Sequence, residues 1–453
     1  MKIRYFLVML LVSLASACSV LDRAFEGFVP TATPTPLTAG LYIPPVCAGK
    51  LIATMPAFSA TAQPTSAISA NPEISKSEQL KVFDATTKKV DEVYVSPDFN
   101  GLDWSAIVAK YRAKIDAGLD TENFYTEMQR LMAELKDQHS AFRPPVYVKA
   151  DEATFAGKAD YVGIGASTLP MIEKGKVTLV SILPGAPAEH GGLKPHDSIL
   201  AIDGTPIIQD GVNTLFRIRG PECSAVTLRV QSPGEKARDV LFMRFRITSS
   251  VPISSQLVQT KDGARIGYIF LPSFADGTFP EQVRKTLKSF GKLDGLILDN
   301  RLNAGGDSKA LLPILSYFTT GTLGYFSSRK VNAYLQIDPD PVENSQNVPL
   351  VVLVGEGTIS FGEIFSGALQ DVGRAKLVGQ TTLGNVESLQ AFNLFDGSQV
   401  WIAAERFVPT NHPNADWEKD GIIPDVEAFA DWDTFTFETD PAIAAALKLL
   451  GHK

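Results

Sequence analysis

The chain has 453 residues, a formal net charge of −8 and a sequence pI near 5.3. This length allows two or three domains with cores of their own, and the apolar and charged content is that of an ordinary soluble protein. The acidic balance argues against nucleic acid as a partner and against a basic patch lying on a membrane. No internal apolar run is long enough to span a bilayer.

The N-terminus has the pattern of a secretory leader, because Lys2 and Arg4 precede an apolar stretch that ends in small residues. The residues "LASA" before Cys18 resemble a bacterial lipoprotein cleavage site, with Leu14 one position further back than usual. We therefore expect residues 1–18 to be a signal peptide and Cys18 to be lipidated. An ordinary leader or an uncleaved anchor is the alternative. The protein is then extracytoplasmic, tethered to the membrane only through its N-terminus, or else secreted.

Residues 19–75 are rich in Pro, Thr, Ser and Ala, a composition typical of a flexible linker without a core. Cys47 lies within this linker, and Cys223 is the remaining cysteine. In an exported protein these two could form one disulfide, and two free thiols are the alternative. Two cysteines cannot make a four-ligand zinc site. We expect no metal site in the chain.

Residues 76–150 predict an N-terminal helical domain. The stretches "DWSAIVAKYRAKIDAGL" and "DTENFYTEMQRLMAELKDQHS" each place their apolar residues on one helical face. Asp120 or Thr121 is the expected N-cap of the second helix. Continuing its apolar face by four residues from Leu135 reaches His139, which should lie at the inner edge of a helix end.

Residues 155–248 change to short strands with Gly and Pro turns and predict a small β-rich domain. We expect His190 and His196 to be exposed turn residues within it. From 260 to 435 apolar strands alternate with helices, which predicts an α/β domain. Residues 436–453 predict a final helix.

Ser360 has two interpretations. The apolar run "PLVVLVG" predicts a buried strand before it, and a helical pattern follows it. Ser360 and Glu363 form S-x-x-E, a capping box, so the local pattern alone favours a helix cap. A serine nucleophile needs a base, usually a histidine oriented by a carboxylate. His139 is the best placed candidate, although a lone histidine at a helix end is more often structural.

An acyl-transfer site also needs donors for the oxyanion. The Phe361 N–H lies at the start of a predicted helix, where the helix dipole favours negative charge. Gly305 and Gly306 follow a predicted strand in "LDNRLNAGG", where glycine lets a backbone N–H approach a ligand closely. The alternative for these glycines is a simple tight turn. There is no G-x-G-x-x-G motif and no phosphate loop, so we expect no cofactor.

Together, "LDNRLNAGG", the serine before F-G-E-I, "DGSQVWIAAERFVP" and "EKDGIIPDVE" resemble the tail-specific (C-terminal-processing) proteases and the tricorn core protease. The likeness extends from about residue 80 to 427. It implies an α/β catalytic domain of crotonase/ClpP-like type, with an inserted β-rich PDZ-like domain and an N-terminal helical segment.

The stretch "YVGIGA" resembles the loop of a PDZ domain that receives the C-terminal carboxylate of a peptide. This resemblance implies peptide contacts from Tyr161, Val162, Gly163, Ile164 and Gly165.

The resemblance offers two catalytic layouts. Tail-specific proteases use a Ser–Lys dyad, but Asn385 stands at the position of the lysine, and asparagine cannot act as a general base. The tricorn-like layout uses serine, histidine and glutamate, which here are Ser360, His139 and Glu418. Gln138 stands where that layout has a supporting serine. Asn385 is then either a polar residue lining the site or a turn residue.

The resemblance therefore predicts an exported serine endopeptidase that hydrolyses peptide bonds in proteins or peptides through an acyl-enzyme. Its oxyanion donors are Phe361 and either Gly305 or Gly306. The main alternative is an inactive peptide-binding lipoprotein of the same fold, suggested by Asn385 and Gln138. An acyl-thioester enzyme is a third reading, but no nucleotide site supports it. The sequence does not predict the oligomeric state.

Overall fold

The computed structural model describes residues 42–47, 71–137, 139–209, 211–249 and 252–452. The predicted signal peptide, the lipidation at Cys18 and the side chain of Gln138 lie outside these residues. None of the helices in the described stretches is both long enough and apolar enough to cross a membrane.

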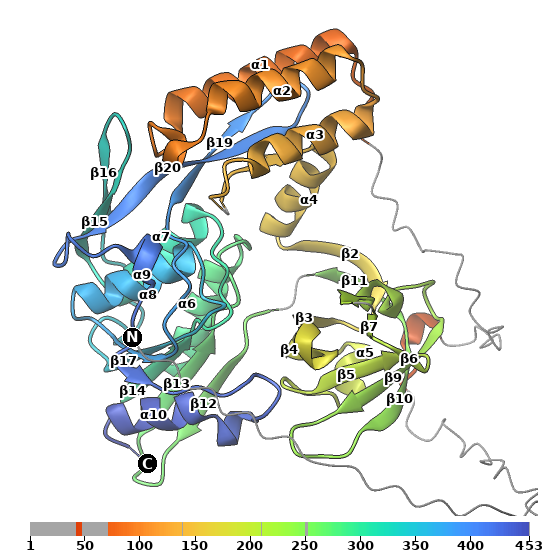
Figure 1. The fold of residues 1–453 in the computed structure, drawn as a ribbon. Helices are drawn as coiled ribbons and strands as arrows, with labels where there is room; N and C mark the ends of the chain where they lie inside the picture. Colours follow the sequence, from red (N-terminus) through yellow and green to blue (C-terminus); the bar gives the residue numbers. More distant parts are fainter. Residues whose placement is uncertain (1–41, 48–70, 138, 210, 250–251, 453) are drawn as a thin grey trace, which may run out of the picture. The chain divides into compact units, whose positions relative to one another are not determined.

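Residues 71–155 contain four α-helices, which Figure 1 labels α1 to α4. They are α1 (Lys76–Val93), α2 (Trp104–Asp116), α3 (Thr121–Ala133) and α4 (Pro145–Phe155). The Asp120 carboxylate accepts the N–H of Asn123, so the predicted N-cap of α3 is confirmed. The apolar faces of α1, α2 and α3 share one core with Val400 and Ile402 of strand β20 (Gln399–Pro409).

The prediction that His139 lies at a helix end is wrong. Helix α3 ends at Ala133, and Lys136 adopts a positive φ of 57°, which turns the chain out of the helix. His139 therefore lies in the loop between α3 and the short strand β1 (Ala141–Arg143).

The β-rich domain contains a sheet of order β10-β9-β5-β4-β3 and a separate antiparallel pair, β2 and β11. Strand β3 ends the described sheet, so one of its edges is unpaired within it. The bounds are β2 (Lys158–Gly163), β3 (Ala166–Met171), β4 (Lys176–Ile182), β5 (Ser198–Ile202), β9 (Ala225–Gln231), β10 (Arg238–Met243) and β11 (Phe245–Ser249). Shorter elements are helix α5 (Pro187–His190) and strands β6 (Thr205–Pro206), β7 (Ile208–Gln209) and β8 (Val212–Asn213).

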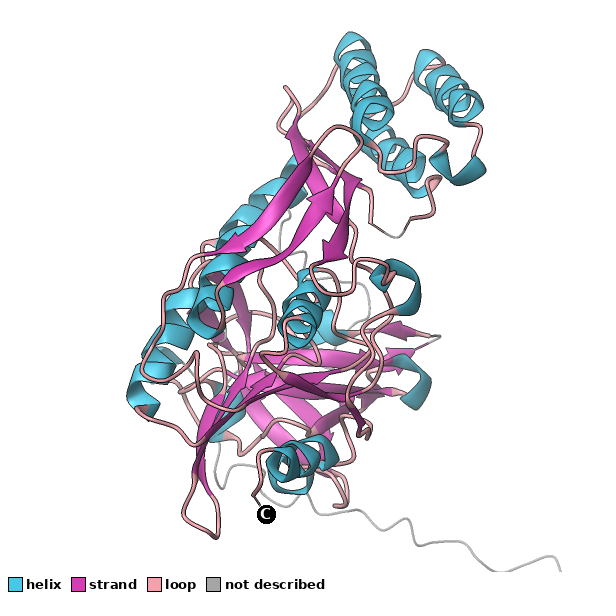
Figure 2. Cartoon of the chain, turned by 90° about the vertical axis from the view of Figure 1, so that its left-hand side faces the viewer, coloured by secondary structure: helices cyan, strands magenta, loops and turns pink. Residues whose placement is uncertain are grey.

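The α/β domain is built on a sheet of order β12-β13-β14-β17-β18-β21, parallel except for β12. The central strands β14 and β17 are buried along their whole length. Elements of the chain cover both faces of this sheet, as Figures 1 and 2 show. Helices α6, α7 and α8 contribute to the core on one face and α10 to the core on the other. The strand bounds are β12 (Ser255–Gln259), β13 (Arg265–Phe270), β14 (Gly295–Asp299), β17 (Leu350–Val354), β18 (Lys376–Gly379) and β21 (Val426–Glu427). The helix bounds are α6 (Phe279–Phe290), α7 (Ser308–Phe318), α8 (Phe361–Asp371) and α10 (Pro441–Leu449).

A second sheet joins the helical domain to the α/β domain. Its order is β1-β20-β15-β16, with β19 also pairing with β20. The remaining bounds are β15 (Gly321–Ser327), β16 (Asn332–Ile337), β19 (Ser388–Asn393) and the short helix α9 (Trp417–Asp420). Five 3-10 turns occur at Pro45–Cys47, Phe99–Gly101, Ile172–Lys174, Leu215–Ile218 and Phe437–Thr439 among the described residues.

His196 lies in a turn, as predicted, but it is buried, so the prediction that it is exposed is wrong. Its Nδ1 lies 2.8 Å from the carbonyl oxygen of Trp432, and its ring packs against the rings of Trp432 and Phe435. Burial lowers the pKa of His196, although the hydrogen bond to Trp432 acts in the opposite direction. The histidine thus belongs to a contact between the β-rich domain and the segment that precedes α10. His190, by contrast, is exposed at the end of α5.

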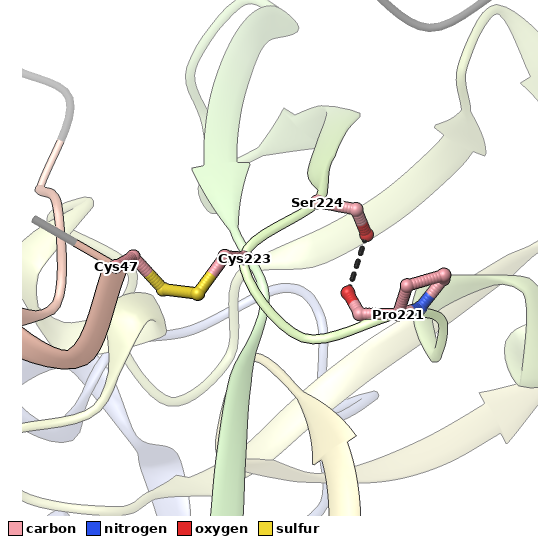
Figure 3. Close-up of a disulfide and its surroundings, with 4 residues drawn as sticks. All are labelled: Cys47, Pro221, Cys223 and Ser224. Carbon is pink, nitrogen blue, oxygen red and sulfur yellow. Dashed lines mark hydrogen bonds between the residues drawn. A yellow bond between two sulfur atoms is a disulfide. The ribbon is translucent and has the colours of Figure 1, made fainter. Parts of the chain in front are cut away.

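Cys47 and Cys223 form a disulfide, which settles the question that the sequence left open (Figure 3). The bridge joins positions 176 residues apart and has a Cα–Cα distance of 5.4 Å. Beside it, the Ser224 hydroxyl donates to the Pro221 carbonyl at 2.6 Å. The ring of Tyr42 stacks on His190. The short segment 42–47 is therefore fixed to the β-rich domain.

We expect Cys47→Ser to lower the free energy of unfolding by about 2–4 kcal/mol, because the unfolded chain loses a long cross-link. Urea denaturation followed by circular dichroism measures this loss. Ser249→Ala, at an exposed position of β11 in the same domain, is the control and should stay within about 0.5 kcal/mol of wild type. Recovery of Cys47 and Cys223 only as free thiols in a non-reducing peptide map would contradict the bridge.

Candidate active site

Ser360 lies at the junction between strand β17 and helix α8. It occupies the N-cap of α8, and the capping box with Glu363 that S-x-x-E predicts is present. Its backbone has φ 56° and ψ −125°, a conformation that non-glycine residues rarely adopt. Such strain costs about 1–3 kcal/mol and is concentrated at functional sites, where the surrounding contacts maintain it.

The contacts that hold Ser360 come from the chain after β18. Its N–H donates to the Asn385 carbonyl at 2.8 Å and to the Glu363 carboxylate at 3.1 Å. The Glu363 carboxylate also accepts the N–H groups of Gly384 and Asn385 and the hydroxyl of Thr382. Burial raises the pKa of Glu363, whereas these hydrogen bonds favour its charged form. This one carboxylate therefore ties the serine to the 382–385 loop.

Asn385, at the position of the family's lysine, supports the site through its backbone. Its carbonyl accepts from Ser360 and its N–H donates to Glu363, as described above. Lys376, the first lysine after Ser360 in the sequence, is exposed, and its Nζ lies 2.7 Å from a carboxylate oxygen of Asp425. Neither residue places an amine near the serine.

His139 and Glu418 form a close pair although 279 residues separate them. His139 Nε2 lies 2.9 Å from Glu418 Oε1, and the His139 side chain is only 4% exposed. The other oxygen of Glu418 accepts the N–H groups of Val386 and Glu387, at 2.7 and 3.0 Å. Ser360 bonds to Asn385, so the serine and the His139–Glu418 pair are attached to one three-residue segment, 385–387.

The loop that carries His139 is held by local hydrogen bonds. The Asp137 carboxylate accepts the N–H groups of His139 and Ser140 and the hydroxyl of Ser140. The Ser140 hydroxyl in turn accepts the N–H of Ala403 on β20, at 3.0 Å. The support expected from Gln138 lies outside the described residues.

The environment of His139 favours the imidazolium form. Burial acts to lower the pKa of His139, but the hydrogen bond and charge of Glu418, with the charges of Glu387 and Asp137, outweigh it and raise the pKa. An orienting carboxylate has this effect in Ser–His–acid sites, where it stabilises the imidazolium that forms during the reaction.

Glu387 was not among the sequence candidates. It is 7% exposed, and one of its carboxylate oxygens lies within 4.8 Å of a ring nitrogen of His139 and of a carboxylate oxygen of Glu418. Burial and the charge of Glu418 raise its pKa, against the influence of His139 and Arg406. Nothing in the local pattern "NVESLQ" indicates this role, because it depends on a contact with residues far away in the sequence.

The three predicted oxyanion donors do not all remain available. A Cβ at Gly305 would lie 2.8 Å from the Ser360 Cβ and 3.0 Å from the Phe361 nitrogen, so these backbones are in close contact. The Gly305 N–H, however, donates to the side chain of Asn303 at 2.9 Å. Within the described residues the N–H groups of Phe361 and Gly306 have no hydrogen-bond acceptor. They are therefore the two free donors, and Asn303 is a supporting residue that the sequence did not indicate.

Within the described residues no hydrogen bond joins the Ser360 hydroxyl to His139. The Nε2–H of the neutral imidazole donates to the Glu418 carboxylate, so Nδ1 is the nitrogen that can accept a proton. Catalytic hydrogen bonds without substrate are often long and tighten when substrate binds. The geometry is thus that of a serine, a histidine and a glutamate gathered at one loop.

The predicted peptide-binding stretch 161–165 leads from β2 into β3. Ile164 is buried, and its carbonyl and that of Gly165 are already bonded to Ala188 and Leu183. The guanidinium of Arg219 lies 4.8 Å from the centre of the Tyr161 ring. The unpaired edge of β3 begins directly after this stretch.

Comparison with known proteins supports this architecture. The peptidase family S41 profile matches residues 265–428, a PDZ domain profile matches 178–232, and the tricorn protease C1 domain profile matches 75–133. The chain is 30% identical to a carboxyl-terminal-processing protease of Synechocystis sp., over 82% of this chain and 87% of that protein. A second carboxyl-terminal-processing protease, from Picosynechococcus sp., is 32% identical over 80% and 86%. The chain belongs to peptidase family S41 and is a serine-type peptidase with a PDZ domain.

Solved structures agree with this assignment. A photosystem II D1 C-terminal processing protease is 25% identical, with a TM-score of 0.53, over 84% of this chain and 98% of that one. A protein from Bacteroides fragilis assigned to the S41 proteases shares the fold, with a TM-score of 0.55 at 14% identity. The predictions of an S41-type peptidase and of a PDZ domain are confirmed.

We expect Glu363→Gln to destabilise the protein by roughly 2–4 kcal/mol. The amide NH₂ that it introduces would face N–H donors that now bond to a carboxylate oxygen. Urea denaturation tests this, with the exposed Glu356→Gln as the charge-matched control, which should stay within about 0.5 kcal/mol of wild type. Equal stability of the two variants would contradict the anchoring role of Glu363.

A histidine can act as a base only in its neutral form, so the raised pKa of His139 predicts that activity depending on this group rises with pH, with a midpoint above the ordinary histidine pKa. Glu418→Gln should move this rise in kcat to lower pH and reduce kcat by roughly 10²–10⁴-fold. A pH–rate profile of both proteins measures the two effects. An unchanged midpoint in the variant would show that Glu418 does not control the titrating group.

Proposed function

We propose that this peptidase is an exported endopeptidase that uses Ser360 as its nucleophile, His139 as its general base and Glu418 as the residue that orients and stabilises the imidazole. The observation that carries the proposal is the shared attachment of Ser360 and of the His139–Glu418 pair to residues 385–387. A catalytic fold of crotonase/ClpP-like type, implied by the family resemblance, belongs to the same proposal.

In the first half of the reaction, His139 Nδ1 takes the Ser360 proton as the serine oxygen attacks the peptide carbonyl carbon. The N–H groups of Phe361 and Gly306 stabilise the oxyanion, and the dipole of α8 adds to them. The imidazolium then gives its proton to the leaving amine, which departs from the acyl-enzyme. Water attacks the acyl-enzyme by the reverse proton path, and the product acid leaves.

The PDZ domain supplies a site for peptide. An extended peptide can add to the unpaired edge of β3 through main-chain hydrogen bonds. Residues 161–165 would receive its terminal carboxylate, with Arg219 close by to add positive charge. Proteins with accessible C-terminal tails are therefore the proposed substrates, which agrees with the names of the carboxyl-terminal-processing relatives.

The proposal includes export of the protein through the leader at residues 1–18 and its attachment to the membrane by lipidation of Cys18. An oxidised Cys47–Cys223 pair supports a location outside the cytoplasm, where disulfides persist.

We expect the full chain to cleave an unfolded model protein and both Ser360→Ala and His139→Ala to lose this activity while remaining folded by circular dichroism. Two exposed residues serve as matched controls, Ser308→Ala for the serine and His412→Ala for the histidine, and both should cleave normally. Unchanged cleavage by Ser360→Ala would refute the proposed nucleophile. Cleavage by His139→Ala alone would place the base elsewhere.

A further inference from the structure

The proposed mechanism uses Ser360, His139 and Glu418 but gives no role to the buried Glu387. Glu418 alone orients His139, yet Glu387 places a second carboxylate beside the same imidazole. One nitrogen of His139 and one oxygen from each glutamate all lie within 4.8 Å of one another. The only described side chain that pairs with Glu387 is Arg406, at 3.4 Å, and that arginine is 60% exposed.

We propose that His139, Glu387 and Glu418 form a binding site for Zn²⁺ and that the bound ion switches the peptidase off. Binding stands on the geometry of the cluster. Inhibition rests on the proposed function, since it requires His139 to be the base.

The ligand set selects the kind of cation. An imidazole nitrogen with two carboxylate oxygens suits Zn²⁺, which bonds both at about 2.0–2.2 Å and accepts three protein ligands with water in the fourth position. Mg²⁺ and Ca²⁺ prefer all-oxygen sites with more ligands. Two ligand atoms are already 2.9 Å apart, and the third lies close by. The Glu418 side chain is 31% exposed, so the site has a route for an ion and a water.

Charge also favours a cation here. The buried carboxylate of Glu387 lies close to the half-buried carboxylate of Glu418, and burial and the charge of Glu418 both raise the pKa of Glu387. A divalent ion would neutralise both groups at once, which the exposed Arg406 does not do.

The effect on catalysis follows from the single proton of a neutral imidazole. In the metal-free enzyme the proton on Nε2 points to Glu418, and Nδ1 is free to accept from Ser360. When Zn²⁺ bonds to Nε2, the imidazole proton resides on Nδ1 instead. His139 then has no lone pair to take the serine proton, and Glu418 is bound to the metal.

Binding is tested directly with ZnCl₂ by isothermal titration calorimetry on the untagged, non-reduced full chain carrying Ser360→Ala. We expect one site per chain, and roughly 10–100-fold weaker binding when Glu387→Gln is added. His139→Ala is the second ligand variant, Glu356→Gln and His412→Ala are the controls, and MgCl₂ is the control ion. The site would be overturned if the parent chain bound no zinc. It would also be overturned if folded Glu387→Gln and His139→Ala chains bound zinc as tightly as the parent chain does.

Inhibition is tested by protein cleavage in zinc and in a chelator. Each protein is compared with its own rate in the chelator. Wild type and Glu356→Gln should fall at least 10-fold with saturating zinc and recover with the chelator, whereas the rate of Glu387→Gln should fall by much less at the same zinc concentration. A wild type that binds zinc but cleaves at full rate would overturn the switch. Zinc binding that requires Glu387, in a chain that never cleaves, would instead contradict the proposed function and leave the metal site standing.

Discussion

The site depends on the carboxylate of Glu418. One oxygen holds the buried imidazole of His139, and the other accepts two consecutive N–H groups of the 385–387 segment. The Glu418 side chain is 31% exposed, and these contacts give each of its oxygens a hydrogen-bond partner. Helix α9, the loop after α3 and the segment before β19 therefore meet at one point.

A second carboxylate, Glu363, organises the other half of the site. It anchors the 382–385 loop to the start of α8 and helps to hold Ser360 in a strained backbone conformation. Glu363 and backbone groups thus surround the serine, with Asn385 at the position where the resemblance to the tail-specific proteases implies a lysine. Asn385 contributes its backbone to the serine, and in the proposed mechanism the proton acceptor is His139 from the loop after α3.

Local patterns in the sequence predicted much of this protein. The cap at Asp120, the capping box at Ser360 and the alternation of strands and helices depend on neighbouring residues and are visible in any short window. The resemblance that identified the S41 peptidase and its PDZ domain rests on short motifs of the same kind. The helical position predicted for His139 was wrong because α3 ends at Ala133 and the left-handed Lys136 redirects the chain. The exposure predicted for His196 was wrong because Trp432, which is far away in the sequence, packs against its ring. Glu387 and Asn303 gave no signal, since their roles come only from tertiary contacts.

The central claim is that His139 activates Ser360, and covalent labelling tests it most directly. A serine-directed fluorophosphonate is mixed with the full chain, and the rate of labelling and the modified residue are determined by mass spectrometry. We predict rapid modification of Ser360 in wild type and a large loss of rate in His139→Ala, while His412→Ala labels as wild type does. Equal labelling rates in wild type and His139→Ala, or modification of a different serine, would contradict the account.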